Sequence, residues 1–206
     1  MRRTTRVVGL ALAAGTLLAA GACKGGYRGR DTATAGGAVS DSAARDTANR
    51  ANTAAGASGL SDANIVAMLD AANAADSASG ALAVRKGRNA DVKAFGRLMM
   101  GEHHALRVQG QQLARKLGVT PQAPADWDLP KQHDDQVKDL EGKSGADFDK
   151  TYIDDEVDVH QKVMDLTNRA LASAQNPELK DLIQKAQPVI QKHLDRAKQI
   201  QGRIKT

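Results

Sequence analysis

The stretch FDKTYIDDEVDVHQKVMDLTNRAL, residues 148–171, decides which fold class this sequence favours. Its apolar residues recur at steps of three and four, which is the spacing of one face of an α-helix. Glu156 and His160 lie in phase with Tyr152 and Val163 on that face. A carboxylate and an imidazole inside an apolar stripe cost free energy unless they find partners. The stretch therefore predicts a helix whose buried face holds either a satisfied polar layer or a pair of ligands.

The composition extends the helical prediction to the whole chain. Aromatic residues make up only 2% of the 206 residues, whereas a sheet protein uses more aromatic and β-branched side chains. The hydrophobic content of 41% is enough for one well-buried domain. Basic and acidic residues are interspersed and no aromatic stacking platform accompanies them, which argues against a nucleic-acid partner. We therefore expect an all-α protein with one folded domain.

Residues 1–22 have the features of a secretory signal peptide. MRRTTR supplies the positive start, VVGLALAAGTLL the apolar run, and AAGA the small residues before Cys23. LLAAGAC resembles the lipobox of bacterial lipoproteins, whose cysteine is lipidated after cleavage, with Ala20 where Leu is commonest. The alternative is ordinary cleavage after Ala22, which leaves Cys23 as an unpaired thiol. Both alternatives predict export to the periplasmic side of the cell envelope, and the first predicts a lipid anchor in a membrane.

Residues 23–59 predict a flexible linker between this anchor and the folded domain. The segment consists mainly of Gly, Ala, Ser, Thr, Asp and Arg. It has too few large apolar side chains to offset the entropy that ordering would cost. We therefore expect the folded domain to comprise residues 60–206.

Five helical segments are expected in this domain, at about residues 61–85, 91–117, 131–143, 148–171 and 178–204. Gly118 marks the end of the second segment. Pro188 should kink or break the last segment near Lys185. Four long amphipathic segments with mostly short connections favour an antiparallel four-helix bundle, with the short helix inside the longer crossover.

Each long segment carries polar residues near mid-length on its apolar stripe. The primary candidates for a site are Asp76, His103, Glu156, His160 and His193, and the secondary candidates are Glu102 and Tyr152. Carboxylates and imidazoles from facing helices hold metal ions in some bundles, so one interpretation of the set is a site for a divalent metal such as iron.

The interpretation that the sequence favours is instead a hydrogen-bonded layer that fixes the helix register without an ion. In that layer His103 would pair with Asp76 or Glu156, and His193 with Glu156. The sequence contains no Glu-x-x-His pair, nucleophilic triad or phosphate loop, so we assign no catalytic residue.

Three motifs add a resemblance that covers about residues 60–205. They are an acidic residue followed by histidine (Glu102-His103), Phe-Asp with a downstream Tyr and His (Phe148, Asp149, Tyr152, His160), and Pro with a His five residues later (Pro188, His193). Together they resemble a bacterial family of exported proteins, the domain of unknown function 4142 family. The resemblance implies a ferritin-like fold and export, but no reaction. Two residues differ from the family's usual ones, because Asp76 replaces a longer Glu and Gln187 replaces a Leu.

The sequence alone thus favours a non-catalytic interaction or structural role in the envelope, with an unknown protein partner. The alternative is a metal-binding or stress-protective bundle that uses the inward carboxylates and histidines. A dinuclear oxidase is a third hypothesis, which is disfavoured because only two clear inward carboxylates are present.

Overall fold

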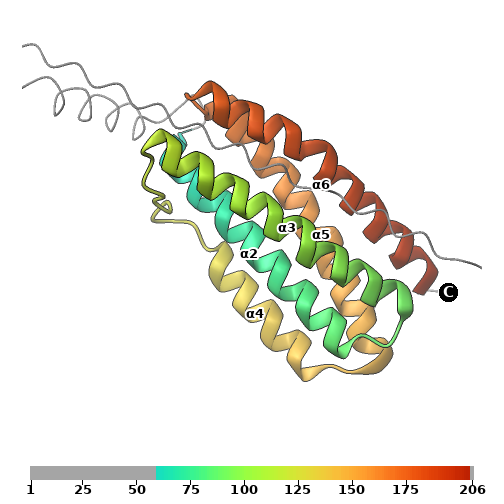
Figure 1. Ribbon diagram of the computed structural model, residues 1–206. Coiled ribbons are helices and arrows are strands. Elements are labelled where there is room, and N and C mark those ends of the chain that lie inside the picture. Colours follow the sequence, from blue (N-terminus) through green and yellow to red (C-terminus); the bar gives the residue numbers. More distant parts are fainter. Residues whose placement is uncertain (1–58, 205–206) are drawn as a thin grey trace, which may run out of the picture. The chain divides into compact units, whose positions relative to one another are not determined.

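A computed structural model describes residues 59–204 of the chain (Figure 1). The predicted signal peptide, Cys23 and the linker up to residue 58 lie outside the described residues. The described part contains no strand and forms five helices: α2 (Asp62–Lys86), α3 (Ala90–Leu117), α4 (Leu129–Gly142), α5 (Gly145–Ser173) and α6 (Pro177–Ile204). None of these helices has an apolar stretch long enough to cross a membrane. The all-α prediction is confirmed for this part of the chain.

Local signals in the sequence explain where the helices begin and end. The Ser61 side chain accepts a hydrogen bond from the Asn64 N–H (3.1 Å), and the Asn64 side chain accepts one from the Ser61 N–H (3.0 Å). This reciprocal pair is a capping box at the start of α2. Gly118 ends α3 in the left-handed conformation at φ 65°. Pro188 is predicted to kink or break the last helix, and it does not break it, since α6 continues through that residue.

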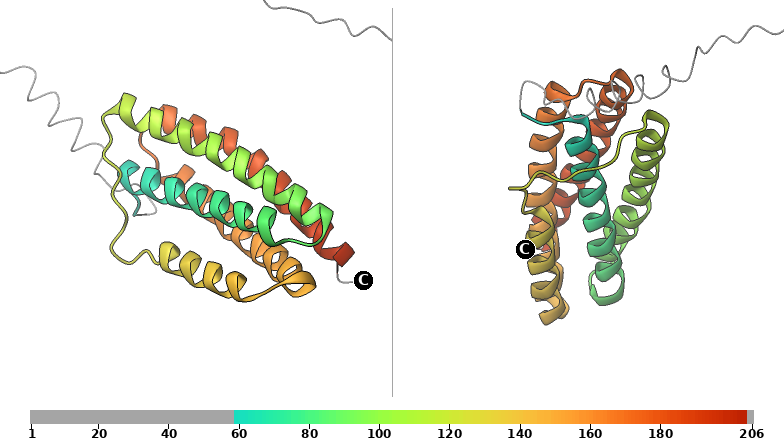
Figure 2. Two further views of the ribbon diagram at one scale, coloured as in Figure 1. Left: turned by 60° about the horizontal axis from the view of Figure 1, so that its bottom comes forward. Right: turned by 90° about the vertical axis from the view of Figure 1, so that its left-hand side faces the viewer.

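The four long helices form two antiparallel hairpins, α2 with α3 and α5 with α6 (Figures 1 and 2). Two buried carboxylates join the hairpins at opposite ends of the bundle. Asp62 accepts hydrogen bonds from the backbone amides of residues 175–176 (2.8 and 3.0 Å). Asp149 accepts hydrogen bonds from the backbone amides of residues 88–89 (2.9 and 2.7 Å). These contacts place the start of each hairpin beside the turn of the other, so α2 and α5 are antiparallel.

The short helix α4 carries the chain back along the bundle before α5 begins (Figure 2). The His133 Nε2 lies 3.1 Å from the Ala75 carbonyl oxygen, which holds α4 on α2. At the other end, the Lys86 ammonium donates to the backbone carbonyls of Leu140 and Glu141 (3.2 and 2.5 Å). Because of this crossover, α3 and α5 begin at the same end of the bundle. The bundle with a short helix in its long crossover agrees with the prediction, and its likeness to ferritin-like bundles stays a prediction.

The helices α2 and α3 approach each other closely at two glycines. A Cβ atom on Gly80 would lie 2.6 Å from the Gly96 carbonyl oxygen, and one on Gly96 would lie 2.7 Å from the Gly80 carbonyl oxygen. No side chain fits at such distances, so the two backbones are in direct contact. Gly80 is one helical turn beyond Asp76, and this contact therefore sets the helix separation next to the polar residues.

Apolar clusters fill the bundle at both ends of the polar residues. One cluster includes Phe95, Tyr152 and Ile200, and another includes Ile65 and Ile183. The buried polar residues near mid-length of each long helix lie between these two clusters.

Candidate metal centre

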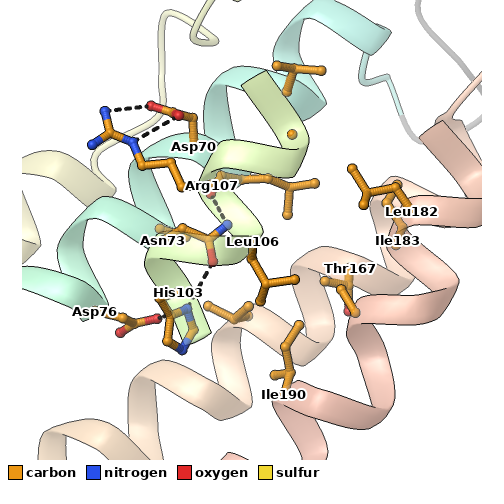
Figure 3. A pocket seen from close by; sticks show the side chains of 16 residues that line it. Asp70, Asn73, Asp76, His103, Leu106, Arg107, Thr167, Leu182, Ile183 and Ile190 are labelled. Carbon is orange, nitrogen blue, oxygen red and sulfur yellow. Dashed lines mark hydrogen bonds and ion pairs between the residues drawn. The ribbon is translucent and has the colours of Figure 1, made fainter. Parts of the chain in front are cut away.

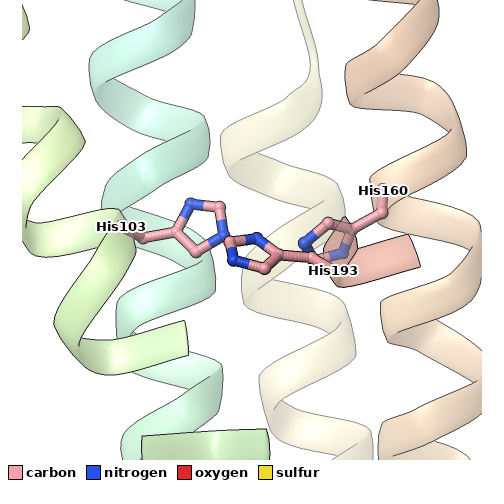
Figure 4. A group of neighbouring side chains, drawn as sticks. All are labelled: His103, His160 and His193. Carbon is pink, nitrogen blue, oxygen red and sulfur yellow. The ribbon is translucent and has the colours of Figure 1, made fainter. Parts of the chain in front are cut away.

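All four long helices contribute buried side chains to one polar cluster. The cluster comprises the five primary candidates: Asp76 from α2, His103 from α3, Glu156 and His160 from α5, and His193 from α6. Each of the five is at most 3% exposed. The three imidazole rings lie side by side (Figure 4), with centroids 5.1, 5.4 and 5.6 Å apart.

Two overlapping groups in the cluster have the spacing of metal ligands. One ligand atom from each of His103, His160 and His193 lies within 4.8 Å of those from the other two. The same limit holds for Asp76, Glu156 and His160. Because His160 belongs to both groups, the five residues form one continuous set of nitrogen and oxygen donors.

Hydrogen bonds to fixed acceptors determine the tautomers of two histidines. His103 Nδ1 lies 2.9 Å from the Asn73 Oδ1. The Asn73 amide group donates to the Leu69 carbonyl oxygen (2.7 Å), which orients its own oxygen toward the ring. His160 Nδ1 lies 2.8 Å from the Glu156 backbone carbonyl oxygen. Both acceptors lack a hydrogen, so the proton of each neutral ring is on Nδ1 and the lone pair is on Nε2.

His193 is held in the same manner by a residue at the surface. Its Nε2 lies 2.7 Å from the Glu102 Oε2, and the Glu102 side chain is 46% exposed. This bond leaves the lone pair of a neutral ring on Nδ1. On each ring one nitrogen, the outer one, is thus bonded, and the other, the inner one, has no hydrogen-bond partner among the described residues. The three inner nitrogens are His103 Nε2, His160 Nε2 and His193 Nδ1.

Burial keeps the three rings neutral. It lowers the pKa of His103 to about 2, with further lowering by the charges of His160 and His193. Burial also lowers the pKa of His160 to about 4, against the raising effect of its bond to the Glu156 carbonyl. The pKa of His193 is lowered by burial and partly restored by Glu102. Neutral imidazoles are the form in which histidine binds metal ions.

The two carboxyl groups of the cluster also lack full hydrogen bonding. Asp76 Oδ2 lies 3.5 Å from His103 Nδ1, and Glu156 Oε2 lies 3.4 Å from His160 Nδ1. Neither oxygen has a hydrogen-bond partner in the described part of the chain. Burial raises the pKa of Asp76 to about 7. Burial and the charge of Asp76 raise the pKa of Glu156 well above its usual value.

The two secondary candidates lie at the edge of the cluster. Tyr152 is fully buried beside Glu156, and burial followed by the charge of that carboxylate raises the pKa of its hydroxyl well above the usual value. Glu102 faces His193 from the outer side rather than sharing the interior. It is thus placed to orient a ligand and not to be one.

Two features of the hydrogen bonding differ from the layer that the sequence predicted. His103 Nδ1 bonds to Asn73, which sequence reasoning missed although it lies three residues before Asp76, while the predicted partner Asp76 lies 3.5 Å from the same nitrogen. The partner of His193 is Glu102 and not Glu156. Both differences have the same cause. Asn73 and Glu102 lie at the margin of an apolar stripe, where helical periodicity does not tell whether a side chain points inward or outward.

Two small cavities adjoin the cluster from different sides. A cavity of about 50 Å³ lies among α2, α3, α5 and α6, with Asp76 and His103 at its inner end (Figure 3). A second cavity of about 20 Å³ lies under α4 and includes Asp76, Tyr152 and Glu156 in its lining. Asp76 is therefore in contact with both cavities.

Comparisons with known proteins identify a family but no characterised relative. No curated protein and no solved structure matches the chain significantly. One family profile matches residues 46–200, which includes every residue of the polar cluster. The chain therefore belongs to the family described as Domain of unknown function (DUF4142).

Proposed function

We propose that this protein binds a divalent transition-metal ion in the buried cluster. The ligands would be the imidazoles of His103, His160 and His193 and the carboxylates of Asp76 and Glu156. The observation that carries the proposal is the set of three inner imidazole nitrogens that have no hydrogen-bond donor among residues 59–204. Each outer nitrogen is bonded to a carbonyl or carboxylate oxygen, and metal-binding histidines are oriented by such bonds.

A register-setting polar layer would leave this arrangement unexplained. In such a layer each buried acceptor should face a donor, because an unpaired buried polar group costs about 1–3 kcal/mol. Here each of the three rings has one buried nitrogen without a hydrogen-bond partner among the described residues, and one nitrogen of each ring lies within 4.8 Å of one nitrogen of each other ring. A cation among them would satisfy all three lone pairs together.

The spacing is close to that of a bound ion. Bonds from imidazole to a metal are about 2.0–2.1 Å long, so two ligands of one ion lie at most roughly 4.2 Å apart. Within each of the two groups of three, the ligand atoms lie within 4.8 Å of one another. For one such group, side-chain rotations that move the atoms by less than about 1 Å would therefore suffice.

Charge balance favours one ion and suggests its class. Three neutral imidazoles would leave a divalent ion with its charge uncompensated in the interior, which is costly. The buried carboxyl groups of Asp76 and Glu156, whose pKa values are raised, would release their protons on binding and supply two negative charges beside it. Mixed nitrogen and oxygen donors suit iron(II), manganese(II) and zinc(II), and an iron-type site is the alternative hypothesis from the sequence.

The test is to measure bound metal on the full chain purified without chelator, and then to add each ion to metal-free protein. We expect close to one ion per chain, and a higher melting temperature. An ion at 100 times its Kd stabilises the folded state by about 2.7 kcal/mol, and each kcal/mol raises the melting temperature by about 2–4 °C in a protein of this size.

Two variants make the test specific. His160→Ala removes the ligand shared by both groups, so binding should be lost. His104→Ala changes a neighbour of His103 that is exposed, so binding should be unchanged. A metal-free protein whose melting temperature ignores all three ions would contradict the proposal.

We further propose that the chain is exported and anchored by lipid at Cys23, as the sequence of residues 1–23 suggests. The metal centre would then work on the periplasmic side of the envelope. Mass spectrometry of the mature N-terminus tests the anchor, and an unmodified Cys23 would rule it out.

A further inference from the structure

We infer that the ion reaches the centre through the cavity among α2, α3, α5 and α6, along a ladder formed by Asp70, Asn73 and Asp76. This inference rests on the proposed metal binding and adds the route by which a hydrated divalent cation enters. The outer end of the ladder is held by Arg107.

The ladder follows from the helical spacing of its three residues. Asp70, Asn73 and Asp76 are three residues apart on successive turns of α2, and all three line the cavity (Figure 3). Asp70 is at the outer end, with 28% of its side chain exposed, and Asp76 is buried. Oxygen atoms thus continue from the partly exposed end of the cavity to the cluster, along an otherwise largely apolar wall.

A bidentate ion pair occupies the outer end. The Arg107 Nε and Nη2 donate to the two Asp70 carboxylate oxygens at 3.0 and 3.2 Å. Gln111 donates to the same carboxylate at 2.7 Å. The positive charge of Arg107 repels an approaching cation and occupies the carboxylate that would first receive it. We therefore expect Arg107 to slow entry without affecting the final ligands.

The cavity among α2, α3, α5 and α6 has a volume that suits a partly hydrated ion better than the volume of the cavity under α4. A water needs at least about 10–15 Å³ of such volume, so the cavity of about 50 Å³ has room for roughly three water-sized groups. The cavity under α4 measures about 20 Å³. His133 of α4 lines this second cavity and contacts the Ala75 carbonyl oxygen.

The experiment follows cobalt(II) uptake by the full chain with stopped-flow visible absorption, and measures the Kd at equilibrium. Gly110 lines the cavity, and among the described residues a Cβ atom there would meet no atom within 4 Å apart from the nearby backbone of its own helix. Gly110→Leu should therefore fold and obstruct the outer part, slowing uptake by roughly tenfold, which is about 1.4 kcal/mol in the barrier. Gly101→Leu is the matched control on the same helix, since Gly101 has the same open surroundings and does not line the cavity.

Arg107→Gln should speed uptake several-fold at low salt, and the gain should shrink as salt screens the charge. Arg97→Gln removes the same charge from an exposed position of α3 and should have little effect. The Kd should stay within about twofold in all four variants, because none changes a ligand.

If both Gly110→Leu and Arg107→Gln bind cobalt(II) with normal Kd and with unchanged uptake rates, the proposed route is wrong, while the proposed metal binding stands. Faster uptake in His133→Ala, with no effect of the other changes, would overturn it in favour of the cavity under α4. Failure of the unmodified protein to bind cobalt(II) at equilibrium would instead overturn the proposed function.

Discussion

Replacing Gly80 with alanine should separate α2 from α3 and weaken both the fold and the metal centre. The new Cβ atom would lie 2.6 Å from the Gly96 carbonyl oxygen and 3.0 Å from the Met99 Cβ. A carbon–oxygen contact needs about 3.3 Å, so the two backbones must separate locally by about 0.7 Å. Overpacking of this kind costs about 1–3 kcal/mol, whereas replacing Gly with Ala in a helix gains up to about 1 kcal/mol.

The control for this prediction is Gly101→Ala, which has the same propensity gain and no steric cost, because in the described part of the chain no atom outside the nearby backbone of its own helix lies within 4 Å of the added Cβ. The two variants should therefore differ by about 1–3 kcal/mol in the free energy of unfolding. Urea denaturation of metal-free protein measures this difference, and the separation should be a few degrees in melting temperature. Equal stability of Gly80→Ala and Gly101→Ala would refute the direct backbone contact. Metal affinity should fall in Gly80→Ala only, because Asp76 is one turn away.

Two further predictions concern the cluster itself. Glu102→Ala should weaken metal binding by about 10–100-fold, because it removes the hydrogen bond that orients His193. The control Asp158→Ala, at an exposed position, should leave metal binding unchanged. Equal metal affinities of the two variants would contradict the orienting role of Glu102. Asp76→Asn should gain stability relative to the unmodified metal-free protein as pH rises from about 4 to 8. The reason is that burial raises the pKa of Asp76 to about 7 in the folded state. The stability that this carboxyl group contributes is fully present below its pKa in the unfolded chain. It is lost as the pH rises through its pKa in the folded protein. Urea titrations across that range measure the trend, and a constant difference between the two proteins would contradict it.

The fold and the inward residues could be predicted from sequence because helical periodicity assigns each residue to a face. Asp76, His103, His160 and His193 each lie in an apolar stripe, and a bundle must turn those stripes inward. Periodicity does not determine how far one helix slides along another. The bonds of Asp62 and Asp149 to the opposite turns decide that register, and they join residues about 60 or more positions apart in sequence. Such contacts have no local signal.

Pro188 shows a different limit of local reasoning. Proline removes one helical hydrogen bond and disfavours the helical conformation of the preceding residue. In α6 the apolar face on both sides of Pro188 is nevertheless buried, at Ile183 and Ile190. Packing along the whole helix thus compensates for one lost bond, and α6 reaches His193 without interruption.

The close approach of α2 and α3 also accounts for the shorter acid in the first helix. Asp76 replaces the longer Glu usual in the family that the sequence resembles, and an aspartate reaches about one bond less far. With glycine at positions 80 and 96, the backbone of α2 lies directly against that of α3 one turn from this residue. Asp76 Oδ2 accordingly comes within 3.5 Å of His103 Nδ1 despite its shorter side chain. A glutamate at position 76 would need α2 to lie farther away. We therefore expect Asp76→Glu to be tolerated better when Gly80 is also replaced by alanine than when it is introduced alone, as a double-mutant cycle of metal affinity would show.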